Sequence, residues 1–203
     1  MYQAPRGTAD ILPEEQAYWR YIEQKAAEIA NLYGYKKIET PVFEDTGLFT
    51  RSVGEGTDIV QKEMYTFEDR GGNSLTLRPE GTASVCRAYL EHGMQNAPQP
   101  VKLFNLTSFY RYERPQAGRY REFHQLSCEA IGEADPALDA EVIDMAWQLF
   151  RSLGIEKLHL KINDIGCKNC RPAYLDKLKG YYATCNQEVC PDCKVRLEKN
   201  PLR

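Results

Sequence analysis

The sequence predicts an α+β fold in which helices flank an antiparallel β-sheet. Strand-like segments occur in pairs joined by turns, which is typical of hairpins, and helical segments stand between them without a regular strand–helix–strand alternation. Hydrophobic residues make up 42% and charged residues 27% of the 203 residues. This balance is typical of a globular protein with a substantial core.

The amino-terminal part of the chain predicts one helix and one short strand. Pro13 stands at a favourable first helical position, and the apolar residues after it follow helical spacing up to Gly34. Residues 38–43 then predict a strand that Pro41 interrupts. Because proline lacks a backbone N–H, this strand is expected at a sheet edge or a kink.

Two hairpins follow. The first joins residues 63–67 to residues 74–77 through a turn rich in glycine and asparagine. The second is longer and joins residues 101–113 to residues 121–131 around the polar loop 114–120.

Two further helices and a last strand complete the predicted fold. One helix covers residues 82–92, and Asp135-Pro136 begins another that ends before Gly154. Residues 158–162 alternate between apolar and polar side chains, as expected of a strand.

The composition changes near Gly166 to cysteine, lysine and tyrosine. We therefore expect a core over residues 1–165 and a small cysteine-rich helical appendage over residues 166–203. No signal peptide or membrane-spanning stretch is evident, so a cytoplasmic location is expected. The net charge of −3 argues against a broadly basic nucleic-acid-binding surface.

Four of the seven cysteines form two CxxC pairs that nineteen residues separate. They are Cys167, Cys170, Cys190 and Cys193. Four thiolates at this spacing can close a tetrahedral shell around a structural zinc ion, which would stabilise a segment with little core. The alternative is a set of reduced cysteines in a helical insertion, and Cys185 could be a free thiol or another ligand.

The loop of the second hairpin concentrates positive charge. Four arginines lie within eleven residues, namely Arg111, Arg114, Arg119 and Arg121. Guanidinium groups form forked contacts with phosphate and carboxylate, so the cluster favours a polyphosphate ligand. A solvated turn neutralised by Glu113 and Glu122 is the alternative.

Strand parity indicates which side chains face such a ligand. Alternate residues after the loop share one face of the strand: Phe123, Gln125, Ser127 and Glu129. The opposite face is apolar and suits a core: Leu126, Cys128 and Ala130. An aromatic ring, a carboxamide and a carboxylate on one sheet surface, beside an arginine, could hold an amino-acid adenylate.

Four separated segments resemble one family. Residues 109–125 (FYRYERPQAGRYREFHQ) resemble motif 2 of class II aminoacyl-tRNA synthetases in its histidine-specific form. Residues 6–13 (RGTADILP) resemble the amino-terminal signature of histidyl-tRNA synthetases, and residues 76–82 (TLRPEGT) resemble their amino-acid-binding loop. Residues 35–44 resemble motif 1. The resemblance covers essentially the entire chain.

The resemblance implies a histidine site. Glu80, Gly81 and Thr82 would bind the substrate, with Glu80 and Thr82 on its ammonium group. Gln125 would bridge the ammonium and the carboxylate, and Glu129 would accept a hydrogen bond from the imidazole. Thr82 is also a candidate helix N-cap, a structural role compatible with binding.

The resemblance also implies an ATP site. Arg111 would contact the α-phosphate and the substrate carboxylate and stabilise charge in the transition state. Glu113 would bind the adenine amino group, Arg119 the terminal phosphate, and Phe123 would stack on the base. ATP would bind with Mg²⁺.

The implied enzyme is a histidine–tRNA ligase that activates L-histidine with ATP and transfers it to tRNA(His). Motif 1 implies a homodimer. Motif 3 and an anticodon-binding domain would lie outside these residues, so this chain alone is not expected to complete aminoacylation. The alternative is a regulatory paralogue that binds histidine and partners ATP phosphoribosyltransferase, although the intact ATP-binding residues weigh against it.

Overall fold

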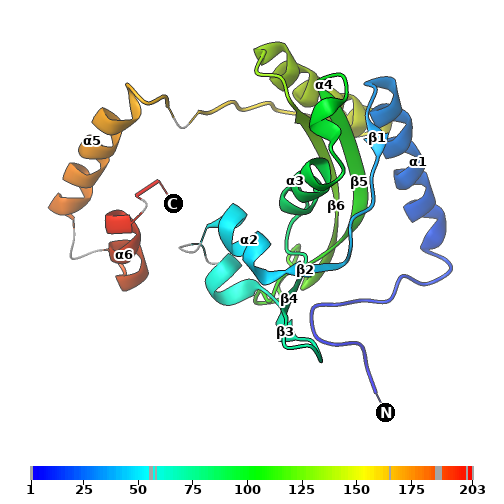
Figure 1. The fold of residues 1–203 in the computed structure, drawn as a ribbon, viewed down its shortest axis with the longest axis horizontal. Coiled ribbons are helices and arrows are strands. Elements are labelled where there is room, and N and C mark those ends of the chain that lie inside the picture. Colours follow the sequence, from blue (N-terminus) through cyan, green and yellow to red (C-terminus); the bar gives the residue numbers. More distant parts are fainter. Residues whose placement is uncertain are drawn as a thin grey trace. The chain divides into compact units, whose positions relative to one another are not determined.

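The structure is a computed structural model that describes residues 2–54, 57, 59–164, 166–185, 189–199 and 201–202. The chain divides into two compact units, Met1–Leu158 and His159–Arg203. The predicted division into a core over residues 1–165 and a cysteine-rich appendage over residues 166–203 stays a prediction. Figure 1 shows both units.

The first unit contains the helices and strands that place the site. Its helices are α1 (Gln16–Leu32), α2 (Thr46–Val53), α3 (Thr82–Glu91) and α4 (Pro136–Ser152), with short helical turns η1 (Ile59–Glu63) and η2 (Met94–Asn96). Its strands are β1 (Lys36–Lys37), β2 (Phe43–Asp45), β3 (Thr66–Glu68), β4 (Ser74–Leu77), β5 (Val101–Tyr110) and β6 (Glu122–Ile131).

The strands form two three-stranded sheets, in the orders β1-β5-β6 and β2-β4-β3. Strands β5 and β6 pair antiparallel over their full lengths, from Val101↔Ile131 to Tyr110↔Glu122. The short β1 pairs parallel with β5, and the pairs of the second sheet are antiparallel. The α+β class and both predicted hairpins are confirmed.

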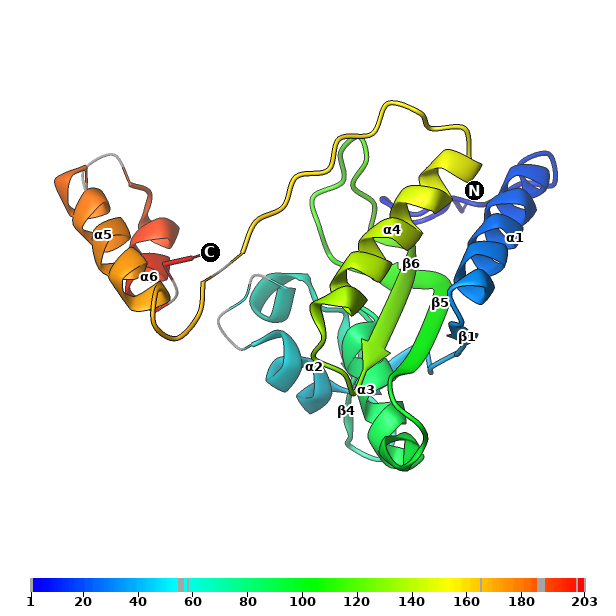
Figure 2. The ribbon, with the colours of Figure 1, turned by 90° about the horizontal axis from the view of Figure 1, so that it is seen from above.

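A hydrophobic core lies on one face of the β5–β6 hairpin. Its buried members are Ala30 of α1, Tyr35 just before β1, Phe104 of β5 and Met145 of α4. Leu126, Cys128 and Ala130 pack against it, as the alternation predicted. Helices α1 and α4 therefore cover this face, and α3 lies on the other side of the hairpin (Figure 1 and Figure 2).

Helix α4 begins as predicted. The Asp135 carboxylate accepts a hydrogen bond from the Ala137 N–H at 2.8 Å, and Pro136 occupies the first turn, where no N–H partner is needed. Helix α1 begins later than predicted. Pro13 lies in a turn, because its carbonyl accepts from the Gln16 N–H at 3.3 Å before the regular helix starts.

The predicted strand over residues 38–43 is wrong as one continuous strand. Of these residues only Phe43 lies in a strand, β2, while β1 ends at Lys37, and the two strands belong to different sheets. The carbonyls of Thr40 and Pro41 accept hydrogen bonds from the Arg78 side chain instead of from a strand. The chain therefore crosses between the two sheets here.

The predicted strand over residues 158–162 is also wrong. Leu160 is 54% exposed, and no strand of the described residues pairs with this segment. Its alternation has no apolar surface to pack against, and pairing rather than pattern defines a strand.

The described residues of the second unit form two helices, α5 (Arg171–Thr184) and α6 (Pro191–Lys199). Neither has a buried side chain among its described residues, as expected of the predicted cysteine-rich helical segment. No described helix is both long enough and apolar enough to cross a bilayer.

Candidate functional site

The loop between β5 and β6 folds back on itself in a compact turn. The backbones of Gln116 and Arg119 exchange two hydrogen bonds, at 3.2 and 2.9 Å, around Gly118, whose φ of +76° suits glycine. Below the turn, the Arg111 N–H donates to the Arg121 carbonyl at 2.9 Å. The hairpin thus continues past β5 and holds its polar side chains at a defined place.

The four arginines of this loop have different environments. Arg119 forms an ion pair with Glu113 at 3.2 Å, and Arg114 is exposed. The Arg121 guanidinium lies over the Tyr112 ring, with its central carbon 3.9 Å from the ring centroid. Arg121 is therefore mainly structural, and the solvated-turn alternative describes Arg114.

Arg111 is held by two contacts. Its Nε donates to the carbonyl of Pro79 at 2.9 Å, and its guanidinium carbon lies 5.2 Å from the centre of the Phe123 ring. Two anchors from different segments hold this side chain, so its remaining donors are directed before any ligand binds.

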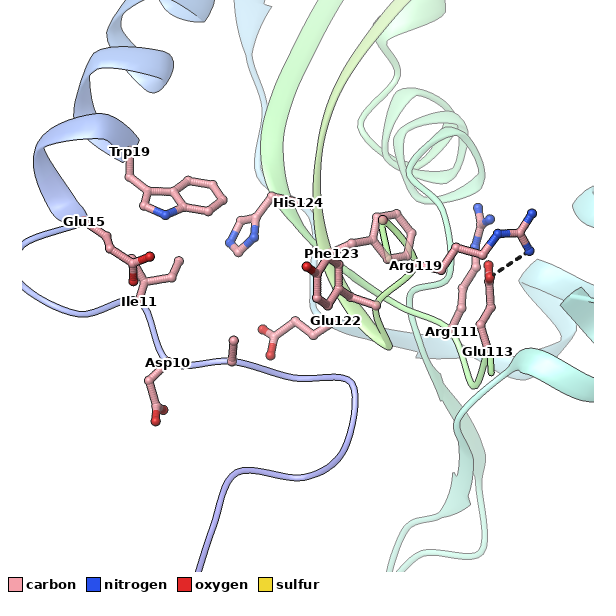
Figure 3. Close-up of a pocket in the computed structure, with 13 residues that line it drawn as sticks. Asp10, Ile11, Glu15, Trp19, Arg111, Glu113, Arg119, Glu122, Phe123 and His124 are labelled. Atoms are coloured by element: carbon pink, nitrogen blue, oxygen red, sulfur yellow. Dashed lines mark hydrogen bonds and ion pairs between the residues drawn. The ribbon is translucent and has the colours of Figure 1, made fainter. Parts of the chain in front are cut away.

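A cavity of about 940 Å³ opens beside this loop (Figure 3). The four side chains predicted to bind ATP all line it: Arg111, Glu113, Arg119 and Phe123. Guanidinium groups, a carboxylate and an aromatic ring on one wall suit a nucleotide with its phosphates. On size and chemistry, the cavity can accept ATP.

The amino-terminal segment forms the other wall of this cavity. Asp10, Ile11, Glu15 and Trp19 line it, and Trp19 packs on the ring of His124 with ring centroids 4.4 Å apart (Figure 3). These residues had no predicted site role, although residues 6–13 were identified as a family signature. Periodicity cannot reveal them, since they lie far along the chain from the loop.

Gly7 fixes that wall to the hairpin. Its carbonyl accepts hydrogen bonds from the N–H groups of Arg121 and Glu122, at 2.7 and 3.2 Å. Gly7 has φ +89°, and a Cβ there would stand 2.8 Å from Cγ of Arg121. Both the conformation and the close approach require glycine.

A second polar cluster lies at the start of α3. The Glu80 carboxylate accepts from the N–H groups of Thr82 and Ala83, at 2.7 and 3.0 Å. The Thr82 hydroxyl donates to Oε1 of Glu129 at 2.7 Å. The predicted N-cap role of Thr82 is wrong, because Gly81 holds that position and the Glu80 side chain satisfies the first N–H groups.

Burial raises the pKa of Glu129 from its ordinary value. The hydrogen bond from Thr82 opposes this effect, and the nearby Glu80 charge adds to it. A partly desolvated carboxylate of this kind favours a cationic or hydrogen-bond-donating ligand.

Gln125 and Gly81 both lie close to the hydroxyl of Ser127. Gln125 donates from Nε2 to the Ser127 hydroxyl at 3.1 Å, on the face predicted by strand parity. A Cβ on Gly81 would stand 3.1 Å from that same hydroxyl, so the start of α3 packs directly on β6. Of the residues predicted to bind histidine, Arg111 lines the 940 Å³ cavity, whereas Glu80, Gly81, Thr82, Gln125 and Glu129 do not. The Pro79–Arg111 hydrogen bond connects the residues that line the cavity to the polar cluster at the start of α3.

The cysteines of the two CxxC pairs lie at the starts of the two helices of the second unit. The Sγ atoms of Cys167 and Cys170 are 3.5 Å apart, just before α5. Cys190 and Cys193 lie at the start of α6. Within the described residues, no three His, Cys, Asp or Glu side chains are grouped so that they could hold a metal ion.

Comparisons with known proteins identify the relatives of the chain. The family model described as histidyl-tRNA synthetase matches residues 7–169. The histidine–tRNA ligase of Dehalococcoides mccartyi (strain 195) is 66% identical over 203 residues, which are 100% of this chain and 49% of that protein. The chain spans about half the length of the curated relatives it matches.

Solved structures also match the fold, and two of them are similar in sequence. The apo histidyl-tRNA synthetase of S. aureus superposes with a TM-score of 0.78 at 44% identity, over 99% of this chain and 47% of that one. A Bacillus halodurans C protein is described as an ATP phosphoribosyltransferase regulatory subunit/histidyl-tRNA synthetase. It superposes with a TM-score of 0.66 at 31% identity, over 77% of this chain and 39% of that one.

Proposed function

The chain belongs to the histidyl-tRNA synthetase family, and on that premise we propose that it carries the histidine- and ATP-binding part of a histidine–tRNA ligase. One observation supports this most strongly. Arg111, which lines the cavity together with Glu113, Arg119 and Phe123, donates a hydrogen bond to Pro79, the residue directly before Glu80 in the cluster of Glu80, Thr82 and Glu129. The proposed nucleotide site and the proposed amino-acid site would therefore be neighbours.

In the proposed reaction the carboxylate of histidine attacks the α-phosphate of ATP. Pyrophosphate leaves and histidyl-adenylate forms, so no side chain serves as a covalent nucleophile. Arg111 would draw the carboxylate toward phosphorus and stabilise the charge that develops there. Its fixed Nε supports this role, because donors that are already oriented need no reorganisation during reaction.

The remaining nucleotide contacts follow from the same cavity. Phe123 would stack on adenine, Glu113 would accept from the adenine amino group, and Arg119 would bind the terminal phosphate. Arg119 pairs with Glu113 at 3.2 Å, so ATP would replace this exposed ion pair with separate contacts. Mg²⁺ would enter with ATP and neutralise phosphate charge.

Histidine selectivity is assigned to Glu129. Its carboxylate would accept a hydrogen bond from the imidazole, while Glu80, Gly81, Thr82 and Gln125 hold the amino-acid end. Amino acids that lack a donor at this position would leave the half-buried carboxylate with only its hydrogen bond from Thr82. That loss can lower the specificity constant by several orders of magnitude.

The enzyme and the regulatory paralogue make different predictions. In a protein that joins this chain to the remaining half of the family's length, histidine-dependent exchange of pyrophosphate into ATP is expected. Histidine binding without exchange would assign the regulatory role instead. The complete arginine and glutamate set of the nucleotide cavity favours the enzyme.

The proposed enzyme is a cytoplasmic homodimer that acts on tRNA(His). Exposed apolar side chains in the motif 1 segment support a partner surface, since Val42 and Phe43 are 44% and 50% exposed. Light scattering is expected to give twice the monomer mass, and a monomer at all concentrations would contradict the dimer.

A structural zinc ion is proposed for Cys167, Cys170, Cys190 and Cys193. The 3.5 Å separation of the first two sulfur atoms supports it, since two ligands of one tetrahedral ion lie at about that distance. Elemental analysis after purification without chelators is expected to find about one zinc per chain. Metal-free protein with unchanged helicity and melting temperature would contradict the proposal.

A further inference from the structure

Arg78 is a buried arginine with neutral hydrogen-bond partners. It is 5% exposed. Its Nε donates to the Ser108 carbonyl at 2.8 Å, and its Nη2 donates to the Thr107 hydroxyl. Its Nη1 lies 2.8 Å from the Thr40 carbonyl and 3.4 Å from the Pro41 carbonyl. The guanidinium therefore clamps the segment between β1 and β2 to the end of β5.

Packing alone does not account for an arginine at this position. Burial lowers the pKa of Arg78, because the charged form loses hydration. Compensation comes from carbonyl dipoles and from the Phe109 ring, whose centre lies 5.5 Å from the guanidinium carbon. An apolar side chain could fill the space without this desolvation cost. The arginine adds a rigid fork of donors that holds several oxygens in one geometry.

The backbone beside this fork leads directly to Arg111. The Arg78 N–H donates to the Val42 carbonyl at 2.9 Å, and the Arg78 carbonyl accepts from the Tyr110 N–H at 3.0 Å. Pro79 follows, with its side chain fully buried. Its carbonyl is the acceptor for Arg111 Nε at 2.9 Å. The position of Arg78 thus determines where this acceptor stands.

We propose that Arg78 is a positioning residue for Arg111: it fixes the Pro79 carbonyl, and that carbonyl orients the Arg111 guanidinium beside the nucleotide cavity. The inference deepens the proposed function, in which Arg111 contacts the α-phosphate. Because Thr40 and Pro41 lie in the segment that resembles motif 1, the same clamp also ties that segment to Arg111.

The Nε–H proton of Arg111 reports this coupling directly. A hydrogen-bonded N–H exchanges with water more slowly than a free one. In the nitrogen-15-labelled 203-residue chain, the Nε–H signal that disappears in the Arg111→Lys variant is assigned to Arg111. Arg78→Lys keeps the charge but loses the fork, and we expect it to accelerate Arg111 Nε–H exchange by about tenfold or more. Met145→Ala is the control, since it opens the core on the opposite face of the hairpin.

Fast exchange in Arg78→Lys with slow exchange in Met145→Ala supports the positioning role. Unchanged exchange in Arg78→Lys overturns it, and so does equal acceleration in both variants. If Arg78→Lys does not fold, Thr107→Val removes a single acceptor and is expected to give a smaller acceleration. No change in that variant also overturns the role.

Titration with Mg·ATP separates this inference from the proposed function. We expect Arg78→Lys to bind ATP about tenfold more weakly than the unmodified chain, with Met145→Ala unaffected when both variants are folded. The exchange measurement decides the positioning role whether or not ATP binds. An unmodified chain that binds no ATP therefore counts against the proposed function alone.

Discussion

The hydroxyl of Thr82 donates a hydrogen bond to the carboxylate of Glu129 at 2.7 Å, across 47 residues of sequence. This contact joins the first residue of α3 to β6 and lies beside the Glu80 carboxylate, which caps the same helix. Both carboxylates of the proposed histidine site are thus held in place, and a ligand with an ammonium and an imidazole could bind both.

Replacing Glu129 by glutamine is expected to weaken histidine binding and spare ATP binding. A hydrogen bond to a charged group contributes about 1.5–3 kcal/mol, so the affinity for histidine should fall by about 10- to 100-fold. Calorimetric titration with each ligand measures both effects. Glu68→Gln, an exposed strand residue on β3, is the control. Equal losses for histidine and ATP would contradict the assigned role.

The same residue predicts a pH dependence of stability. Burial raises the pKa of Glu129 in the folded chain, so the folded state holds this proton more tightly than the unfolded state. Its contribution to stability is present below the unfolded pKa and is lost as pH rises through the folded pKa. Glu129→Gln removes this dependence. Urea unfolding at about pH 4 and about pH 7.5 should therefore show the variant gaining stability over the unmodified chain as pH rises. A constant difference would refute this.

Arg119→Gln separates ligand binding from stability. The Arg119 side chain of the Arg119–Glu113 pair is 64% exposed. Loss of the pair should therefore change the free energy of unfolding by less than about 1 kcal/mol. Loss of a charged contact to the terminal phosphate should weaken Mg·ATP binding by about tenfold or more. Arg114→Gln, in the same loop and exposed, is the matched control. If the two variants bind ATP equally well, Arg119 has no special role.

Gly7→Ala tests whether the amino-terminal wall belongs to the nucleotide site. The added Cβ meets Arg121, and the positive φ is strained for alanine, so the segment should detach at a cost of about 1–3 kcal/mol. ATP affinity is expected to fall while histidine affinity is retained. Gly34→Ala is a control with a similar positive φ and no atom near its Cβ. Unchanged ATP binding in Gly7→Ala would show that this wall does not contact the nucleotide.

Much of the fold follows from local patterns in the chain. The Asp135-Pro136 pair begins α4, and the alternation over residues 122–131 assigns Leu126 to the core and Glu129 to the opposite face. Such patterns succeed because a strand alternates its side chains and a helix needs its first N–H groups satisfied. The motif resemblance added the identities of the arginines and carboxylates at the site.

Contacts between distant segments were decided only by the folded chain. Spacing places Thr82 at the start of a helix, but it cannot show that Glu80 caps that helix and leaves the hydroxyl to Glu129. Likewise, the apolar residues around Pro41 look like a strand until Arg78 binds the neighbouring carbonyls. A polar group bonds to whichever partner packing brings within about 3 Å, and sequence distance does not limit that choice.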